Sequence, residues 1–323
     1  MFKKLLIIFA LLRRYYKQII LVISVMLSMF CVTVFATEKT LITINQFANH
    51  QALDEAKLGI EAALKNRSLL PKHVEIKFSN AQGSIANTVQ IAQYHASLNP
   101  KFMIAIATPA AQANLRARSG SALAFVAVTD PGAAGLENTN NVIGVSDAPN
   151  IAKLLNITQQ LLNFKTIGVI FNPGESSSVQ TVEELKKLAD TKGIKIQQIA
   201  INFSGDIKAA TQKLAGQVEL IYLPKDNLIV SALDGMLRAA DKAKIPVIGN
   251  DPSLVDKGLL LAFGCDYFES GKQLGDMIAD NIEGKDIEHK IQQAKVNKLQ
   301  INHKVAAKLN ITIPRELELQ ESR

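Results

Sequence analysis

The sequence of 323 residues predicts an α/β fold with two doubly wound, Rossmann-like lobes. Three observations lead to this class. Several apolar runs lack the alternation of apolar and polar residues that a strand with one solvent-exposed face shows. They therefore indicate parallel strands buried on both faces. Stretches with helical spacing separate these runs. The alternation occurs in two successive series of similar plan, which indicates two lobes.

The first series begins at residue 40. Apolar runs predict its strands, and apolar residues at helical spacing predict its helices. The elements are strand Thr40–Asn45, helix Leu53–Lys65, strand Val74–Phe78, helix Ile85–Leu98, and strands Phe102–Ala107, Leu123–Val128 and Val142–Val145. The segment from Gly144 to Ile151 would then join the two lobes.

The second series repeats this plan. Its elements are a helix from Ile151, strand Ile167–Phe171, a helix to Ala189, strand Ile194–Ile199, a helix from Ile207, strand Val218–Leu223, a helix from Ile229 and strand Pro246–Gly249. Beyond it, Leu259–Cys265 has the pattern of a strand that crosses back. The helix Asp266–Ile282 would return the chain to the first lobe.

Polar residues gather in the loops that follow five of the predicted strands. In open α/β sheets, ligands bind beyond the carboxyl ends of the strands, and helix starts at this edge favour a carboxylate. Each cluster alone also fits an ordinary helix cap, but five at one edge indicate a cleft for a small polar molecule. The candidate ligand-binding residues are Thr108, Thr129, Asp130, Asn172, Ser176, Ser177, Ser178, Asp226, Asn227 and Asp251.

Enzyme motifs are missing from the most suggestive loop, FNPGESSSVQ at residues 171–180. Gly174 has neither the second glycine nor the lysine of a Walker-type phosphate loop. Ser178 stands where a nucleophile elbow needs its second glycine. The loop carboxylates have no histidine beside them, so they suit an ammonium group better than acid–base catalysis. We therefore expect a binding protein that is not an enzyme and needs no cofactor.

Metal and disulfide chemistry also lack a pattern in this sequence. The five histidines are scattered, and neither HExxH nor paired-cysteine spacing occurs, so we expect no metal site. If residues 1–36 are removed, Cys265 is the single cysteine left, and no internal disulfide can form. It is most simply a small buried residue.

Residues 1–36 have the pattern of an export signal. They hold five basic residues and no acidic one, an apolar run Ile19–Phe35, and the small residue Ala36 at a cleavage position. Because the run has nearly spanning length, an uncleaved anchor is the alternative. Lipid attachment at Cys31 is disfavoured because Phe30 precedes it.

Charge gives no support for a nucleic-acid partner. The full chain has 36 basic and 29 acidic residues, a formal charge of +7. Loss of the five basic residues in 1–36 leaves 31 basic against 29 acidic residues, or +2. A chain so nearly neutral offers no electrostatic footprint for DNA or RNA.

Several segments together resemble a known family. They include AQGSIANTVQIAQ, IAIATPAAQ, AVTDPGAAGL, VIGVSD, IGVIFNPGESSSVQ, IYLPKDNLIVSAL, KIPVIGNDPSLVDKGLLLAFGCDYFESGKQLG and AAKLNITIP. Collinear from about Thr43 to Pro314, they closely resemble ABC-transporter substrate-binding proteins of the tryptophan/tyrosine type. The chain departs from this pattern at Gly249–Pro252 and at Cys265, and the first departure bears on the identity of the ligand.

The resemblance implies a type I periplasmic-binding-protein fold whose lobes close over one small molecule, with the candidate residues above lining the cleft. It implies an amino-acid ligand, aromatic above all, and delivery to a membrane permease with a cytoplasmic ATPase. We expect a monomer at the extracytoplasmic side of the membrane. The expected parts are a signal peptide 1–36, lobe I at 37–147 plus 264–293, and lobe II at 148–263 plus 294–323.

In such a cleft, the hydroxyls and helix starts at Thr108 and Ser176–Ser178 would hold a carboxylate. Asp226, with Asp130 or Asp251, would pair with an ammonium group. Three aromatic residues could stack on the ligand or pack in the core, namely Phe47, Phe171 and Tyr222.

Two alternatives keep the same fold. One is a membrane-anchored ligand sensor with an uncleaved Ile19–Phe35 segment, and the other is a binder of a different solute such as a sugar. A sugar-responsive repressor is disfavoured, because the export segment stands where its DNA-binding helices would be.

Overall fold

The computed structural model describes residues 12–21, 39–287 and 290–321. Met1–Glu38 and Lys39–Arg323 are separate units of the chain. Residues 12–21 form a helix, whereas most of the Ile19–Phe35 run, Cys31 and the cleavage position at Ala36 lie outside the described residues. None of the helices in the described ranges has the length and apolar character needed to span a membrane.

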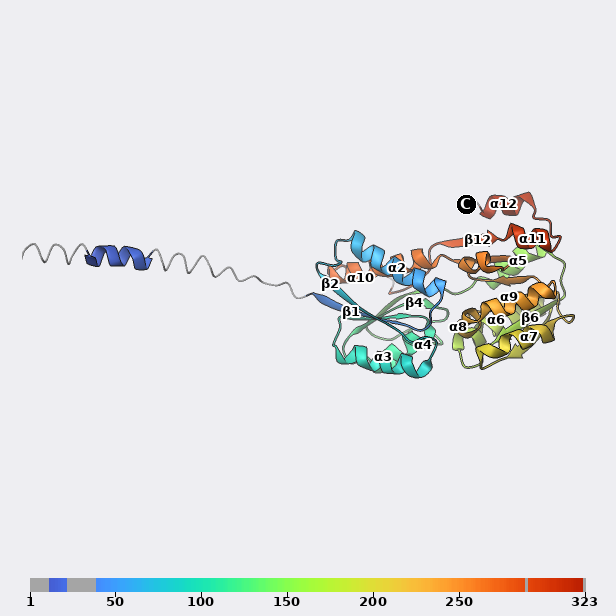
Figure 1. The fold of residues 1–323 in the computed structure, drawn as a ribbon, viewed down its shortest axis with the longest axis horizontal. Helices are drawn as coiled ribbons and strands as arrows, with labels where there is room; N and C mark the ends of the chain where they lie inside the picture. Colours follow the sequence, from blue (N-terminus) through green and yellow to red (C-terminus); the bar gives the residue numbers. More distant parts are fainter. Residues whose placement is uncertain (1–11, 22–38, 288–289, 322–323) are drawn as a thin grey trace, which may run out of the picture. The chain divides into compact units, whose positions relative to one another are not determined.

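Residues 40–146, together with the later segment 291–293, form a sheet in which all neighbouring strands run parallel, in the order β11-β5-β4-β3-β1-β2. Its strands are β1 (Thr40–Gln46), β2 (Val74–Asn80), β3 (Phe102–Ile106), β4 (Ala122–Val128), β5 (Val142–Ser146) and β11 (Ile291–Gln293). Helices α2 (Gln51–Asn66) and α10 (Tyr267–Ile282) cover one face, and α3 (Ile85–Ser97) and α4 (Thr108–Ala117) cover the other (Figure 1). We call this sheet and its four helices lobe I.

A second six-stranded sheet has the order β12-β10-β9-β8-β6-β7, with only β12 antiparallel to its neighbour. Its strands are β6 (Thr166–Phe171), β7 (Lys195–Ala200), β8 (Leu220–Leu223), β9 (Val247–Gly249), β10 (Leu261–Cys265) and β12 (Asn297–Ile301). The helices around it are α5 (Ile151–Leu161), α6 (Ser176–Thr191), α7 (Ile207–Leu214), α8 (Asn227–Ser231), α9 (Leu233–Lys242), α11 (His303–Lys308) and α12 (Arg315–Glu321), with 3-10 turns η1 (Ser204–Asp206) and η2 (Pro252–Lys257). We call this set lobe II.

The predicted fold class is confirmed, because each lobe is a mostly parallel sheet covered by helices on both faces. The central strands are buried along their whole length, as their continuous apolar runs predicted: β3, β5, β8 and β10 expose no residue appreciably. The sequence did not predict β11, β12, α11 or α12. These elements are short, and the polar and charged residues of β11, α11 and α12 obscure any apolar period.

The chain passes between the lobes three times, after β5, after β10 and between β11 and β12. The residue boundaries expected for the lobes, at 147/148, 263/264 and 293/294, stay predictions of where a hinge would turn.

One crossing strand also positions the cleft. A Cβ on Gly264 in β10 would lie 1.8 Å from the carbonyl oxygen of Asn250, so glycine lets the loop after β9 approach closely.

Candidate functional site

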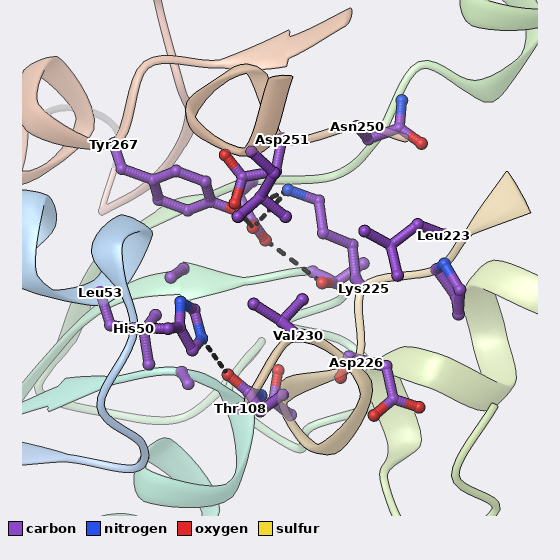
Figure 2. A pocket seen from close by; sticks show the side chains of 18 residues that line it. His50, Leu53, Thr108, Leu223, Lys225, Asp226, Val230, Asn250, Asp251 and Tyr267 are labelled. Atoms are coloured by element: carbon purple, nitrogen blue, oxygen red, sulfur yellow. Dashed lines mark hydrogen bonds and ion pairs between the residues drawn. The ribbon is translucent and has the colours of Figure 1, made fainter. Parts of the chain in front are cut away.

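A pocket lies between the lobes, at the carboxyl ends of their strands (Figure 2). Lobe I contributes residues that follow β3, β4 and β5, among them Thr108, Thr129 and Asp147. Lobe II contributes residues that follow β8 and β9, among them Lys225 and Asp251. Parallel strands bring their carboxyl ends to one edge, so residues far apart in the sequence meet here.

The lobes are close together around this pocket. Its free volume is about 50 Å³, whereas pockets that hold drug-sized ligands measure roughly 300–1,000 Å³. An amino acid would therefore enter only after the lobes move apart or the lining side chains turn away. Hinge closure of this kind is common in two-lobed binding proteins.

One contact across the pocket is an ion pair supported by a phenol. Lys225 Nζ of lobe II lies 3.0 Å from Asp147 Oδ2 and donates a hydrogen bond to Tyr267 Oη. The Tyr267 hydroxyl in turn donates to Asp147 Oδ2 at 2.6 Å, and Thr129 Oγ1 donates to Asp147 Oδ1 at 3.2 Å. Asp147 and Tyr267 are both 5% exposed, so the pair is well shielded from water.

A second contact joins His50 of lobe I to Asn227 of lobe II, with 2.9 Å between Nε2 and Oδ1. Asn227 Nδ2 donates to Glu175, so its carbonyl oxygen faces His50, and His50 must donate from Nε2. Burial lowers the pKa of His50, which favours the neutral ring. Its Nδ1 is then an acceptor, and this atom is buried with no hydrogen-bond partner in the described chain.

Glu175 supports Asn227 from behind. The carboxyl group accepts hydrogen bonds from Ser177 Oγ at 3.0 Å and from the Asn227 backbone N–H at 3.1 Å, and only 4% of the residue is exposed. Burial first, and then the charge of Asp226, raise the pKa of Glu175 to about 8. Glu175 is therefore largely protonated near neutral pH, so that its carboxyl group and that of Asp226 are not both charged while buried side by side.

Asp226 is occupied within lobe II. Its Oδ2 accepts from the Asn172 backbone N–H and from Ser178 Oγ, each at 2.6 Å. Its Oδ1 caps α8 by accepting from the Ile229 N–H at 3.0 Å. Burial raises its pKa. Although Asp226 lines the pocket, its bonds serve mainly to hold the β6 and β8 loops together.

The start of α4 offers a place for an anion. Ala107, before the helix, has φ 84° and provides no side-chain cap, and Pro109 follows in the first turn. The first N–H groups of a helix have no partner within the helix. Thr108 is 4% exposed, and within the described residues nothing bonds its Oγ1. A carboxylate could accept from this hydroxyl and from the free N–H groups.

Asp251 offers a place for a cation on the opposite lobe. Its Oδ1 caps η2, accepting from the N–H and the Oγ of Ser253 at 3.0 and 2.7 Å. Its Oδ2 makes no hydrogen bond or ion pair with any residue that the structure describes. Asp251 is 8% exposed and borders the pocket near Tyr267 and Lys225 (Figure 2). A ligand ammonium group could therefore bind at Oδ2.

The candidate residues from the sequence fall into two groups. Those that line the pocket are Thr108, Thr129, Ser177, Asp226, Asn227 and Asp251. Outside its wall, within the described chain, lie Asp130, Asn172, Ser176 and Ser178. Asp130 caps a turn by accepting from the Ala133 N–H at 2.9 Å, and Asn172 accepts from the Gly174 N–H in the same way.

The three aromatic candidates all lie away from the pocket wall. Phe47 packs in the core of lobe I, and Phe171 packs against a core cluster of lobe II. Tyr222 is fully buried and donates to Asn250 Oδ1 at 2.6 Å. Tyr267 is the aromatic residue that borders the pocket among the described residues.

Sequence reasoning missed several residues of the pocket wall, chiefly His50, Asp147, Lys225, Asn250 and Tyr267. Asp147 and Lys225 stand in segments that the sequence had singled out, directly after predicted strands. Tyr267 opens the helix after the crossing strand β10. His50 also lies in a loop that follows a predicted strand, Thr40–Asn45, but this loop was not among the five that the sequence singled out.

Metal-binding groups of three or more His, Cys, Asp or Glu side chains do not occur among the described residues. Cys265 is buried and free, and burial raises the pKa of its thiol to about 12. It therefore behaves as an inert core residue.

Residues 41–322 match the model of a protein family described as ABC transporter substrate binding protein. The chain belongs to this family. The resemblance found in the sequence is thereby confirmed, and proteins of this family bind small ligands. The chain is also 34% identical over 253 residues to the tyrosine-binding protein of Clostridioides difficile (strain R20291), covering 76% of this chain and 73% of that protein.

Solved structures agree with this membership. A conserved domain protein from Vibrio cholerae O1 biovar El Tor is 36% identical and superposes with a TM-score of 0.84, covering 88% of this chain and 99% of that one. An ABC domain from Streptococcus pneumoniae, solved in complex with L-Trp, is 27% identical with a TM-score of 0.83, again covering 88% and 99%.

Proposed function

We propose that this protein is the extracytoplasmic receptor of an ABC importer and binds an amino acid, most often an aromatic one, between its lobes. Residues 1–36 direct its export, and a membrane permease with a cytoplasmic ATPase receives the ligand. Support comes from the names of two similar proteins, one tyrosine-binding and one solved with L-Trp. No turnover is expected, because the sequence has no nucleophile–base pattern.

The observation that carries the proposal is a pair of buried polar atoms in the pocket wall, Thr108 Oγ1 and His50 Nδ1, which the described protein leaves without partners. Buried polar groups are nearly always hydrogen-bonded in a working state. A ligand that accepts at Thr108 and donates at His50 satisfies both atoms. An amino acid has both kinds of group.

The charges around the pocket suit a zwitterion that joins the lobes. Its carboxylate binds the Thr108 hydroxyl and the free N–H groups of α4 in lobe I. Its ammonium group pairs with Asp251 in lobe II. The sequence had named Asp226 for this role, with Asp130 or Asp251 as its second partner, but Asp226 is engaged by hydrogen bonds within lobe II. The carboxylate thus binds lobe I, and the ammonium group pairs with Asp251 of lobe II and can also donate to His50 Nδ1 of lobe I. Ligand binding favours closure because only the closed form offers all of these partners.

The ligand side chain has an apolar surface to lie on. Leu53 of lobe I, and Val230 and Leu254 of lobe II, border the pocket together with the ring of Tyr267. An aromatic side chain gains both burial and ring contacts there. This assignment, like that of Thr108 and Asp251, is part of the proposal.

Calorimetric titration tests the proposed function. Protein covering residues 37–323, which includes the unit Lys39–Arg323, is titrated with L-tryptophan, L-tyrosine and L-phenylalanine, and with ribose and galactose as controls. We expect heat of binding with at least one aromatic amino acid and none with either sugar. The proposal would be refuted if only a sugar gave heat of binding, or if none of the amino acids did.

A further inference from the structure

Lys225 provides the positive charge in the pocket wall. Within the part of the chain that the structure describes, it is the one lysine or arginine that borders the pocket, and its side chain is 11% exposed. Its ammonium group lies 4.8 Å from the centroid of the Tyr267 ring, in addition to its bonds to Asp147 and the Tyr267 hydroxyl. Lys225 is therefore held in place on three sides.

Both oxygens of Asp147 already have partners, and three of its roughly four acceptor positions are taken. Its Oδ1 accepts from Thr129, and its Oδ2 accepts from both Tyr267 and Lys225. Among the pocket carboxylates, Asp226 is likewise occupied, by Asn172, Ser178 and Ile229. Asp251 alone among these described carboxylates keeps an oxygen without a partner.

Lys225 stays charged in this position. Burial disfavours its ammonium form, but the negative charges of Asp147 and Asp251 outweigh burial, and the pKa of Lys225 lies above its ordinary value. Once the α-ammonium group of the ligand occupies Asp251, a second cation in the same shielded space would meet this fixed charge with no unpaired carboxylate to offset it.

We propose that Lys225 determines the charge selectivity of the cleft by holding the place at Asp147 that a second positive charge on the ligand would need. The cleft therefore accepts amino acids with an uncharged side chain and rejects those with a basic one. This inference rests on the proposed function, in which the α-ammonium group of the ligand binds at Asp251.

The test compares two ligands of similar size and shape, L-phenylalanine and 4-aminomethyl-L-phenylalanine, which carries a second ammonium group. Titration calorimetry measures the affinity ratio of the pair for the wild type, for Lys225→Met and for the double variant Lys225→Met/Asp147→Asn. Methionine keeps the length and apolar stem of lysine, and the double variant removes both partners of the ion pair. Thermal unfolding of each protein shows whether it is folded.

We expect the wild type to prefer L-phenylalanine at least tenfold. Lys225→Met frees Asp147 for the second ammonium group, so the preference should shrink at least tenfold or reverse. The double variant offers no charge to either ligand and should regain the preference. If Lys225→Met does not fold, Lys225→Gln supplies the test, since its amide N–H can still donate to Asp147 while the fixed positive charge is absent, and the same loss of preference is expected.

Three results would overturn the inference. The wild type could bind both ligands equally, Lys225→Met could leave the ratio unchanged, or the folded double variant could accept the second ammonium group as well as L-phenylalanine. Failure of the proposed function looks different. In that case the wild type gives no heat with L-phenylalanine, L-tyrosine or L-tryptophan, and the inference falls with it.

Discussion

Replacing Asp251 with asparagine is expected to weaken binding of an aromatic amino acid roughly 30-fold or more, about 2 kcal/mol or above, because a buried charge-assisted bond loses its anionic partner. The asparagine side chain keeps an Oδ1 that can cap η2 through Ser253, so the loop after β9 should retain its shape. Titration calorimetry with L-tyrosine, L-tryptophan and L-phenylalanine measures the change.

Asp130→Asn is the matched control. Asp130 also follows a strand and also caps a turn through its Oδ1, but it borders a different groove from the pocket. The sequence named Asp226 for the ammonium group, with Asp130 or Asp251 as its second partner, and did not choose between these two. Affinity within about twofold of the wild type is expected for Asp130→Asn, and the opposite ranking of the two variants would show that the ammonium group is assigned to the wrong lobe.

Stability should fall as the pH rises through neutrality because of Glu175. Its pKa is about 8 in the folded state against 4.5 ordinarily, so folding favours the protonated acid. This stabilisation is complete below about pH 4.5 and is lost as the pH approaches 8. At about 1.4 kcal/mol for each unit of pKa difference, the loss amounts to a few kcal/mol.

Urea unfolding at pH 5, 6.5 and 8.5 measures this effect in the wild type and in Glu175→Gln. The variant cannot ionise at this position, so its free energy of unfolding should change less over the range. Glu183→Gln, on the outer face of the same helix, is the control, because Glu183 is exposed and its pKa is lowered rather than raised. Equal pH slopes for the wild type and Glu175→Gln would contradict the burial of a neutral acid.

The fold was predictable because its signals are local and repeated. Runs such as residues 102–106 and 220–223 are wholly apolar, since both faces of each strand are covered. Such a run can be recognised in the sequence without any knowledge of tertiary contacts. Strands β11 and β12 and the terminal helices α11 and α12 escaped prediction for the converse reason, whereas the other two edge strands, β2 and β7, were predicted. Strand β11 reads Ile291, Gln292, Gln293, and no residue in it is fully buried.

The site was only partly predictable, because position after a strand tells which loop lies at the cleft but not where a side chain points. Thr108 and Asp251 were named on that ground and do border the pocket. Ser178 and Asp226 were named on the same ground, yet they bond to each other. Whether a carboxylate caps a helix or meets a ligand depends on donors from distant segments.

The residues that the sequence missed have a related explanation. A lysine in a loop ordinarily projects into water, and nothing near Lys225 in the sequence shows that Asp147, 78 positions earlier, lies 3.0 Å from its Nζ. The place of His50 in the pocket wall is recognised only from the structure, in which it is hydrogen-bonded to Asn227 of the other lobe. Both contacts depend on the approach of the lobes.

The most direct test of a zwitterion bound between the lobes is a comparison of L-tyrosine with two analogues that each lack one pole, tyramine without the carboxylate and 3-(4-hydroxyphenyl)propionate without the ammonium group. Calorimetry on the wild type measures all three affinities under the same conditions. The proposed site predicts that L-tyrosine binds at least about 100-fold more tightly than either analogue, since each loses one charge-assisted set of hydrogen bonds. Equal affinity for L-tyrosine and either analogue would contradict it.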